Sequence, residues 1–380
     1  MSNTKSVSVR HCFAAVPDPR REHMRLHNLW DIIAITILAV VAGADSWVEV
    51  AKYGVSKVDF LKTFLELPHG IPSHDTFCRV FALLNPSALQ EGFVNWVQAI
   101  AEATVGRLVA IDGKTARRSF DKGAGKGPLH MVGAWASANR LLLGQQACDS
   151  KSNEITAIPE LIKNLDISGS IVTIDAMGCQ KTIATALQEA GADYVLAVKD
   201  NQPTLHDSIR QVFSDGLDSG FADMDHHSHR TEEKGHGRVE KRVYHIVRVP
   251  EELAERHADW KGLRSIGLVY SERQEGTKEP SMQTRVFISS LPARVKTFAR
   301  AVRNHWGIET SLHWVLDVSF REDESRLHKG HGQENMALIR RLAASLLQNE
   351  TTCKGGVACK RKCAGWDDEY LLKVLSASLL

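Results

Sequence analysis

The sequence lacks the features that mark a secreted or membrane-spanning protein. Its first residues, MSNTKSVSVRHCF, are polar and contain no apolar signal core. The most apolar run, residues 32–43, is bounded by Asp31 and Asp45, and at about a dozen residues it is too short to cross a bilayer. We therefore expect a cytoplasmic protein in which this run forms a buried helix.

Cysteine is also scarce, and the number of cysteines, seven, is odd, which argues against a disulfide framework. Four are scattered and are expected to be buried thiols: Cys12, Cys78, Cys148 and Cys179. The other three, Cys353, Cys359 and Cys363, lie near the C-terminus without the C-x2-C spacing typical of zinc sites. We interpret them as thiols of a basic tail, with a structural zinc ion as the alternative.

Excess charge is absent as well, because the formal net charge is +2. This balance neither requires nor excludes nucleic acid, so any phosphate-binding surface must be local. The length of 380 residues predicts a core plus an accessory domain. We expect a helical N-terminal domain at 1–104, a mixed α/β domain at 105–350 with a β-rich insertion at about 216–292, and a basic tail at 351–380.

Apolar patterns within the mixed domain predict an alternation of strands and helices. Strands are expected at 107–112, 131–138, 141–147, 170–175 and 194–199, and helices at 155–165, 180–190 and 203–214. This is the strand order of an RNase H-like fold, in which strands one and four are neighbours. Asp112 ends the first strand and Asp175 ends the fourth, so the two carboxylates are expected side by side.

A long helical pattern returns at residue 293 and carries a third acid. Its apolar face is Phe298, Val302, His305, Glu309, Leu312 and Leu316. A buried Glu309 requires a partner or a metal ion. The alternatives are an ion pair with Arg303 and a rotated face that leaves Glu309 exposed. Four later acids compete with it as a metal ligand: Asp317, Glu322, Asp323 and Glu324.

Three carboxylates on separate elements match the requirements of two-metal phosphoryl transfer. Hard oxygen ligands suit Mg²⁺, for which Mn²⁺ is expected to substitute. Two such ions can hold the attacking and leaving oxygens of an in-line displacement. The candidate catalytic and metal-ligating residues are therefore Asp112, Asp175 and Glu309.

Long segments of the chain resemble the H-repeat-associated transposases, a branch of the bacterial insertion-sequence DDE transposases. The segments are VPDPR (16–20), GIPSHDTFCRVFALLNP (70–86), VAIDGKTARRS (109–119), KSNEITAIPELI (151–162), IVTIDAMGCQ (171–180), GADYVLAVKDNQ (191–202) and HWGIETSLHWVLDVSFRED (305–323). The resemblance implies an RNase H-like core with an inserted β-domain, and a triad at Asp112, Asp175 and Glu309. It also implies metal-dependent cleavage at element ends and strand transfer into target DNA.

The chain departs from its relatives at four positions. Related transposases have Tyr, Arg and Lys around the helix glutamate, where this chain has Val302, His305 and Leu316. The family's KGNQ motif contains Asp200 here in place of Gly. These departures keep a catalytically inactive DNA-binding remnant open as the alternative function, and an RNase H-like nuclease that cuts without joining as a third.

Double-stranded DNA is the expected partner, bound by a homodimer. The residues expected to contact it are Lys114, Arg117, Arg118, Lys199, His236, Arg238, Arg242, Arg303 and His305. The N-terminal helices are interpreted either as a helix-turn-helix, with 73–84 in the groove, or as a dimerisation domain. Residues 226–229 are interpreted as a His-rich exposed loop, with a transition-metal site as the alternative. GAGKG (123–127) does not match a P-loop.

Overall fold

The computed structural model describes residues 9–100, 107–120, 127–148, 153–235 and 237–375, and they form two compact units. Unit 1 contains Met1–Ala103, Gly113–Asn153 and Glu309–Leu380, and unit 2 contains Thr104–Asp112 and Glu154–Ile308. Each unit is thus assembled from stretches that are far apart in the sequence. The expected mixed α/β architecture is present.

Unit 1 is mainly helical. Its helices are α1 (Val9–Phe13), α2 (Leu29–Val41), α3 (Trp47–Ser56), α4 (Val58–Leu61), α5 (His74–Leu83), α6 (Pro86–Ile100), α12 (Trp314–Phe320), α13 (Gly332–Asn349), α14 (Val357–Trp366) and α15 (Asp368–Val374), with short 3₁₀ turns at Glu22–Met24 and Glu322–Glu324 and a π-helical turn at Glu309–His313. Helix α13 is the centre of this unit, because it packs against α2, α5, α6 and α14.

Local sequence signals explain two of these helices. The apolar run predicted as a buried helix is α2, in which every residue from Ile32 to Val41 is buried. Ser73 caps α5, because its side chain accepts a hydrogen bond from the backbone N–H of Thr76. The side-chain amide of Asn335 on α13 donates to the carbonyl oxygens of Phe81 and Leu84 and so holds the end of α5.

Unit 2 is built on a mixed sheet. Its strands are, in their order across the sheet, β1 (Leu108–Thr115), β4 (Ile171–Ile174), β5 (Asp193–Val198), β9 (Ser281–Ser289), β8 (Ser265–Glu275), β7 (Arg238–Arg248) and the edge strand β6 (His226–Gly235). Strands β1, β4 and β5 are parallel, and the remaining pairings are antiparallel. The β-rich segment therefore extends the same sheet through the pairing of β9 with β5.

Strand β1 belongs to both units, since its residues up to Asp112 lie in unit 2 and the rest in unit 1. Strand β2 (His130–Ala136) follows β1 in the strand order and pairs antiparallel with β3 (Leu141–Cys148). A turn that includes Asn139 and Arg140 joins them, with Arg140 at a φ of 50°. The predicted order of strand, hairpin, helix, strand, helix and strand is thus confirmed for β1 to β5.

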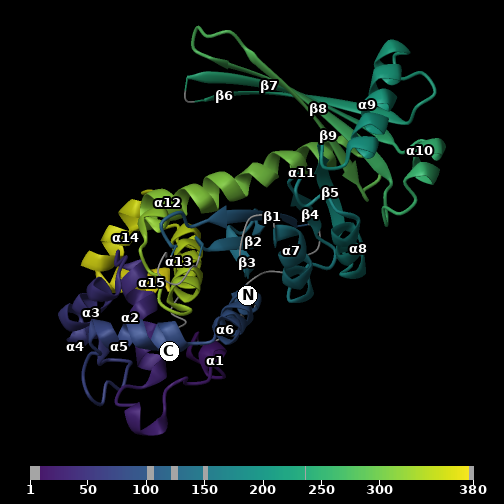
Figure 1. Cartoon of the computed structure of the whole chain (residues 1–380). Helices are drawn as coiled ribbons and strands as arrows, with labels where there is room; N and C mark the ends of the chain where they lie inside the picture. The colour runs from purple at the N-terminus through teal and green to yellow at the C-terminus, as the bar shows by residue number, and fades with distance from the viewer. Residues whose placement is uncertain (1–8, 101–106, 121–126, 149–152, 236, 376–380) are drawn as a thin grey trace, which may run out of the picture. The chain divides into compact units, whose positions relative to one another are not determined.

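Helices cover both faces of the sheet in unit 2. They are α7 (Glu154–Lys163), α8 (Lys181–Glu189), α9 (Pro203–Asp218), α10 (Glu251–Arg256) and α11 (Val295–Ile308). Helix α11 crosses one face, contacting β4 to β7, while α7 and α8 lie on the other (Figure 1). The ring of Phe298 on α11 lies directly over Gly267, where any Cβ would clash with it. Burial of this ring anchors the helix on the sheet.

Two expectations from the sequence are wrong. Residues 226–229 begin strand β6 and are not a loop: β6 is an edge strand that pairs only with β7, so its polar residues need no apolar alternation. His226 and His245 are hydrogen-bonded at 3.0 Å between Nε2 and Nδ1. The supposed basic tail folds into α14 and α15, because Lys360 and Arg361 are buried and hydrogen-bonded to backbone carbonyls.

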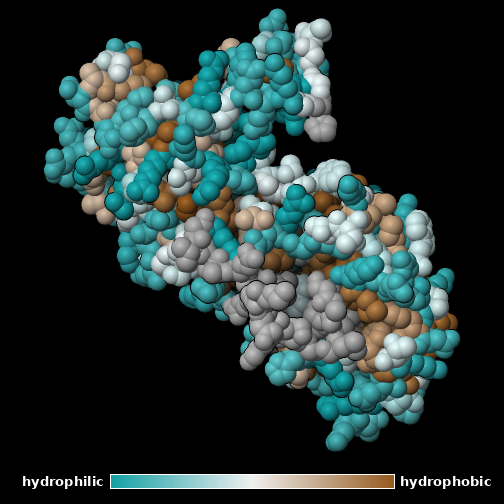
Figure 2. Space-filling model, turned by 180° about the vertical axis from the view of Figure 1, so that it is seen from behind, coloured by the Kyte–Doolittle hydropathy of each residue, from teal (hydrophilic) through white to brown (hydrophobic). Residues whose placement is uncertain are grey.

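No helix in the part of the chain that the structure describes is both long and apolar enough to cross a membrane. Hydrophilic residues cover much of the face drawn in Figure 2, and hydrophobic residues gather there in separate patches. Among the described residues, the large apolar side chain with the highest exposed fraction is Trp366 on α14, with 76% of its surface accessible. The apolar residues of α2 are instead used inside unit 1.

Candidate active site

Asp112 and Asp175 follow directly after the last paired residues of the neighbouring parallel strands β1 and β4, although β1 itself continues to Thr115. In the register of β1 and β4, Ile111 is paired with Ile174, and each aspartate is the next residue along its strand. The carboxyl ends of parallel strands are a common place for ligand-binding residues, because the loops that follow them leave room for a ligand. Both aspartates are half-buried. The predicted adjacency of these two acids in the sheet is confirmed.

The loop after β4 holds Asp175 in one orientation. Its Oδ1 accepts hydrogen bonds from the backbone N–H groups of Met177 at 3.0 Å and Gly178 at 3.4 Å. Both bonds use Oδ1, and within the described residues none reaches Oδ2. One oxygen of this carboxylate is thus committed to the loop, and the other is left for a ligand.

The loop after β5 supports the loop after β4. The side-chain amide of Asn201 donates to the carbonyl oxygen of Ala176 at 2.7 Å, and that of Gln202 donates to the carbonyl oxygen of Cys179 at 3.1 Å. Sequence reasoning assigned no role to these amides. The sequence feature that could have indicated this role is their position in the segment KDNQ, directly after a predicted strand, from which their side chains can reach the neighbouring loop.

His305 on α11 faces the same strand end. Its Nδ1 lies 3.0 Å from Oγ1 of Thr173, the residue on β4 that shares a strand face with Asp175. Burial lowers the pKa of His305, and the negative charge of Asp175 partly opposes this shift. His305 is therefore neutral at neutral pH and presents an uncharged hydrogen-bonding ring near Asp175.

Glu309 follows α11 in the chain and begins a π-helical turn, Glu309–His313, at the start of unit 1's last stretch. A π-turn adds about one residue to a helical turn and so rotates the face that follows. Glu309 is exposed, which agrees with the rotated-face alternative, and among the described residues it forms no ion pair. The alternative partner, Arg303, binds Glu233 through two hydrogen bonds of 2.9 and 2.8 Å.

The four acids that compete with Glu309 are each paired with a basic residue in unit 1. Glu322 is buried and binds Arg341 at 2.7 Å, and Asp317 binds Lys114 at 2.6 Å. The other two pairs are Asp323 with Arg117 and Glu324 with Arg321. Each of these four acids thus has a basic partner, whereas Glu309 has none in the described residues.

Comparisons with known proteins identify the family of the chain. The model of the transposase DDE domain matches residues 103–347, and the model of the domain associated with it matches residues 10–97. The chain belongs to the DDE transposase family. The H repeat-associated putative transposase YhhI of Escherichia coli K12 is 40% identical over 96% of each chain.

Two further proteins are similar to this chain. The putative transposase YncI of Escherichia coli O157:H7 is 41% identical over 96% of this chain and 93% of its own length. A cryo-EM structure of a piggyBac transposase synaptic complex with hairpin DNA aligns with 99% of this chain and 80% of its own. That alignment has 14% sequence identity and a TM-score of 0.44, too low to add to the family assignment.

The basic residues expected to contact DNA in this DDE transposase differ in accessibility. In unit 1, Lys114 is buried and forms an ion pair with Asp317, whereas Arg118 is exposed and Arg117 has 82% of its side chain accessible. Arg117 also reaches Asp323, at 3.3 Å. The segment after Asp112 thus presents two of its three expected DNA contacts to solvent.

The expected DNA contacts in unit 2 also fall into two groups. Lys199 and Arg238 are exposed, and His236 lies outside the described residues. Arg242 is 7% exposed and pairs with Glu233 and Glu240, and hydrogen bonds from Arg303 lower the pKa of Glu233. Arg303 remains about half-exposed beside this pair.

Proposed function

We propose that this DDE transposase is active: it cleaves DNA at the ends of its insertion sequence and joins them to target DNA. The observation that carries the proposal is the pairing of Ile111 with Ile174, after which two half-buried carboxylates follow side by side. Asp112 and Asp175 supply two acids, and Glu309 is proposed as the third. The RNase H-like core is part of this proposal and is supported by the order of strands β1 to β5.

The residues present fit Mg²⁺ by the chemistry of their donors. Asp112, Asp175 and Glu309 offer hard carboxylate oxygens, the ligands that Mg²⁺ and Mn²⁺ prefer. The unshared Oδ2 of Asp175 is the kind of donor that such a site requires. When bound, the ion would polarise the phosphate and lower the pKa of a bound water.

Other residues of the chain would position the acids and the DNA. Asn201 and Gln202 hold the loop behind Asp175, which limits the movement of its carboxylate. The neutral ring of His305 would hydrogen-bond to a phosphate oxygen without adding charge, where related transposases have Arg. Arg117, Arg118, Lys199, Arg238 and Arg303 are proposed to bind the phosphate backbone. The proposed DNA contacts also include His236, Lys114 and Arg242. Of these, Lys114 and Arg242 are buried in ion pairs with acidic residues.

The experiment that tests this function is a cleavage and strand-transfer assay. The full-length protein is incubated with the DNA ends that flank its gene, a target plasmid and Mg²⁺, and the products are resolved at nucleotide resolution. We expect cleaved ends with 3′-hydroxyls and joined products, with Mn²⁺ replacing Mg²⁺, and a protein that acts as a dimer on DNA. Ca²⁺, which is larger and looser in its coordination, should support binding with little turnover.

Two outcomes would contradict the proposal in different ways. A protein that binds its DNA ends specifically but never cuts them, with either Mg²⁺ or Mn²⁺, is the inactive DNA-binding remnant. The observation that favours this alternative is that buried Val302 and Leu316 stand where related transposases have Tyr and Lys. A protein that cuts but never joins is a nuclease.

A further inference from the structure

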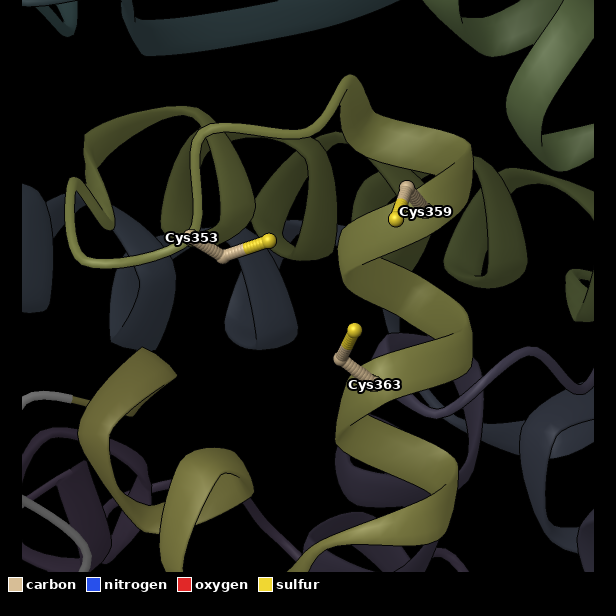
Figure 3. A group of neighbouring side chains, drawn as sticks. All are labelled: Cys353, Cys359 and Cys363. Atoms are coloured by element: carbon tan, nitrogen blue, oxygen red, sulfur yellow. The ribbon is translucent and has the colours of Figure 1, made fainter.

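Three cysteines from two neighbouring segments meet in the C-terminal part of unit 1. Cys353 lies in the loop between α13 and α14, while Cys359 and Cys363 are four residues apart on α14 and therefore share one helix face. Their sulfur atoms all lie within 4.8 Å of one another. Figure 3 shows the three sulfurs directed into one common space. Among the described residues this is the only group of three or more potential metal ligands gathered so closely.

We propose that Cys353, Cys359 and Cys363 bind one Zn²⁺ ion, which leaves one coordination position open to water. A tetrahedral zinc ion with Zn–S bonds of about 2.3 Å places its sulfur ligands about 3.8 Å apart. Sulfurs within 4.8 Å of one another therefore reach this geometry through small side-chain rotations. No fourth His, Cys, Asp or Glu of the described residues joins the group, so the fourth ligand is a water molecule on the side where Cys359 is exposed.

A glycine keeps the space between the thiols open. A Cβ built on Gly355 would lie 2.8 Å from the sulfur of Cys359 and 3.4 Å from that of Cys353. A side chain at this position would thus enter the space where the ion binds. Gly356, one residue later, has no atom within 4 Å of the position that a Cβ would occupy, so the need for a residue without a side chain is specific to position 355.

The loop that carries Cys353 is anchored independently of the thiols. The carboxylate of Glu350 accepts hydrogen bonds from the backbone N–H of Cys353 at 3.2 Å and from the hydroxyl of Tyr370 at 2.7 Å. Hydrogen bonds of this kind around a ligand fix its orientation and raise metal affinity.

The ion would fasten the loop after α13 to α14, a helix that already connects distant parts of unit 1. Arg361 on α14 is buried, donates to the carbonyl oxygens of Val40, Ala44 and Ser319, and stacks over the ring of Phe320. Binding converts three thiols to thiolates and releases three protons as three Zn–S bonds form, so affinity should fall at low pH. The site would stabilise the C-terminal helices and takes no part in the proposed DNA chemistry.

The test measures bound metal directly. The full-length protein is purified under reducing conditions, and its zinc content is determined by mass spectrometry of the metal. We expect about one zinc per chain, since the three thiols together bind one ion, and thiolate-to-cobalt absorption bands after exchange with Co²⁺. C359S and C363S should each weaken zinc binding by more than about tenfold. C78S, which removes a cysteine outside the group, should leave the zinc content unchanged.

A second pair of variants separates metal binding from folding. G355A should raise the apparent zinc dissociation constant by about tenfold or more, since its methyl group occupies the space between two ligands. G356A should match the wild type in zinc affinity and in thermal unfolding. A protein without zinc or cobalt bands, one with an iron–sulfur chromophore, or one with a disulfide between two of these cysteines as purified would overturn the proposal. None of these results depends on DNA cleavage.

Discussion

Replacing Asp175 by Asn separates charge from shape at the candidate active site. In the wild type, Oδ1 accepts hydrogen bonds from the backbone N–H groups of Met177 and Gly178. The amide oxygen of Asn can accept both bonds, so the loop should keep its conformation. Only the unshared oxygen is lost, and with it the negative charge that would hold a divalent ion.

The size of each effect follows from these contacts. Charge-assisted hydrogen bonds are about twice as strong as neutral ones, so weakening two of them should lower the free energy of unfolding by about 1 kcal/mol. Removing an electrostatic stabiliser at a reacting centre typically lowers the rate by about 10³-fold, or about 4 kcal/mol in the activation free energy. Cleavage and joining should therefore both collapse, while folding and DNA affinity change little.

The assay compares three proteins on the same DNA ends with Mg²⁺: the wild type, D175N and D193N. Asp193 begins β5 at the opposite end of the parallel strands and accepts one hydrogen bond, from the hydroxyl of Ser290. D193N should therefore cut at close to the wild-type rate. If D175N retained wild-type cleavage while binding DNA normally, Asp175 would not be a metal ligand and the reasoning from the strand register would fail.

Four further variants test other parts of the structure. Charge reversal of the exposed pair Arg117 and Arg118 should weaken binding to all DNA sequences and reduce the salt dependence of binding; an unchanged salt slope in a titration would mean that this segment is only solvated. D200G removes an exposed charge beside the candidate site and should leave cleavage equal or faster, whereas slower single-turnover cleavage would give this carboxylate a role of its own. N201A removes the bond to the loop behind Asp175 and should slow cleavage by about 5- to 100-fold with unchanged DNA affinity; an unaltered rate would show that the loop needs no support. Burial opposes ionisation of Glu350, but hydrogen bonds from Thr352 and Tyr370 lower its pKa to about 2. The stabilising effect of its charge is therefore fully present above the ordinary pKa of Glu and is lost as the pH falls toward 2. E350Q should reduce the loss of unfolding free energy between these pH values, and a pH dependence identical to that of the wild type would refute the assignment.

Much of the fold could be predicted from the sequence because its signals are local. The apolar run of α2, the cap at Ser73 and the turn at Arg140 act over a few residues, and each is present in the structure. That β1 and β4 are neighbours was equally readable, since alternating runs and helical crossovers determine which strands become neighbours. The predicted end of the first strand at Asp112 is wrong, because β1 continues to Thr115. Strand β6 was missed because an exposed edge strand needs no apolar alternation.

The sequence by itself determined which two acids follow the parallel pairing of β1 with β4, because strand order depends on short-range patterns and on a small set of allowed connections. Only the tertiary structure decided which acids already have partners. Glu322 and Arg341, or Asp317 and Lys114, meet through contacts between segments that no periodicity links. The same holds for the thiols: the helical spacing of Cys359 and Cys363 is visible in the sequence, but the approach of Cys353 depends on how its loop packs against α14.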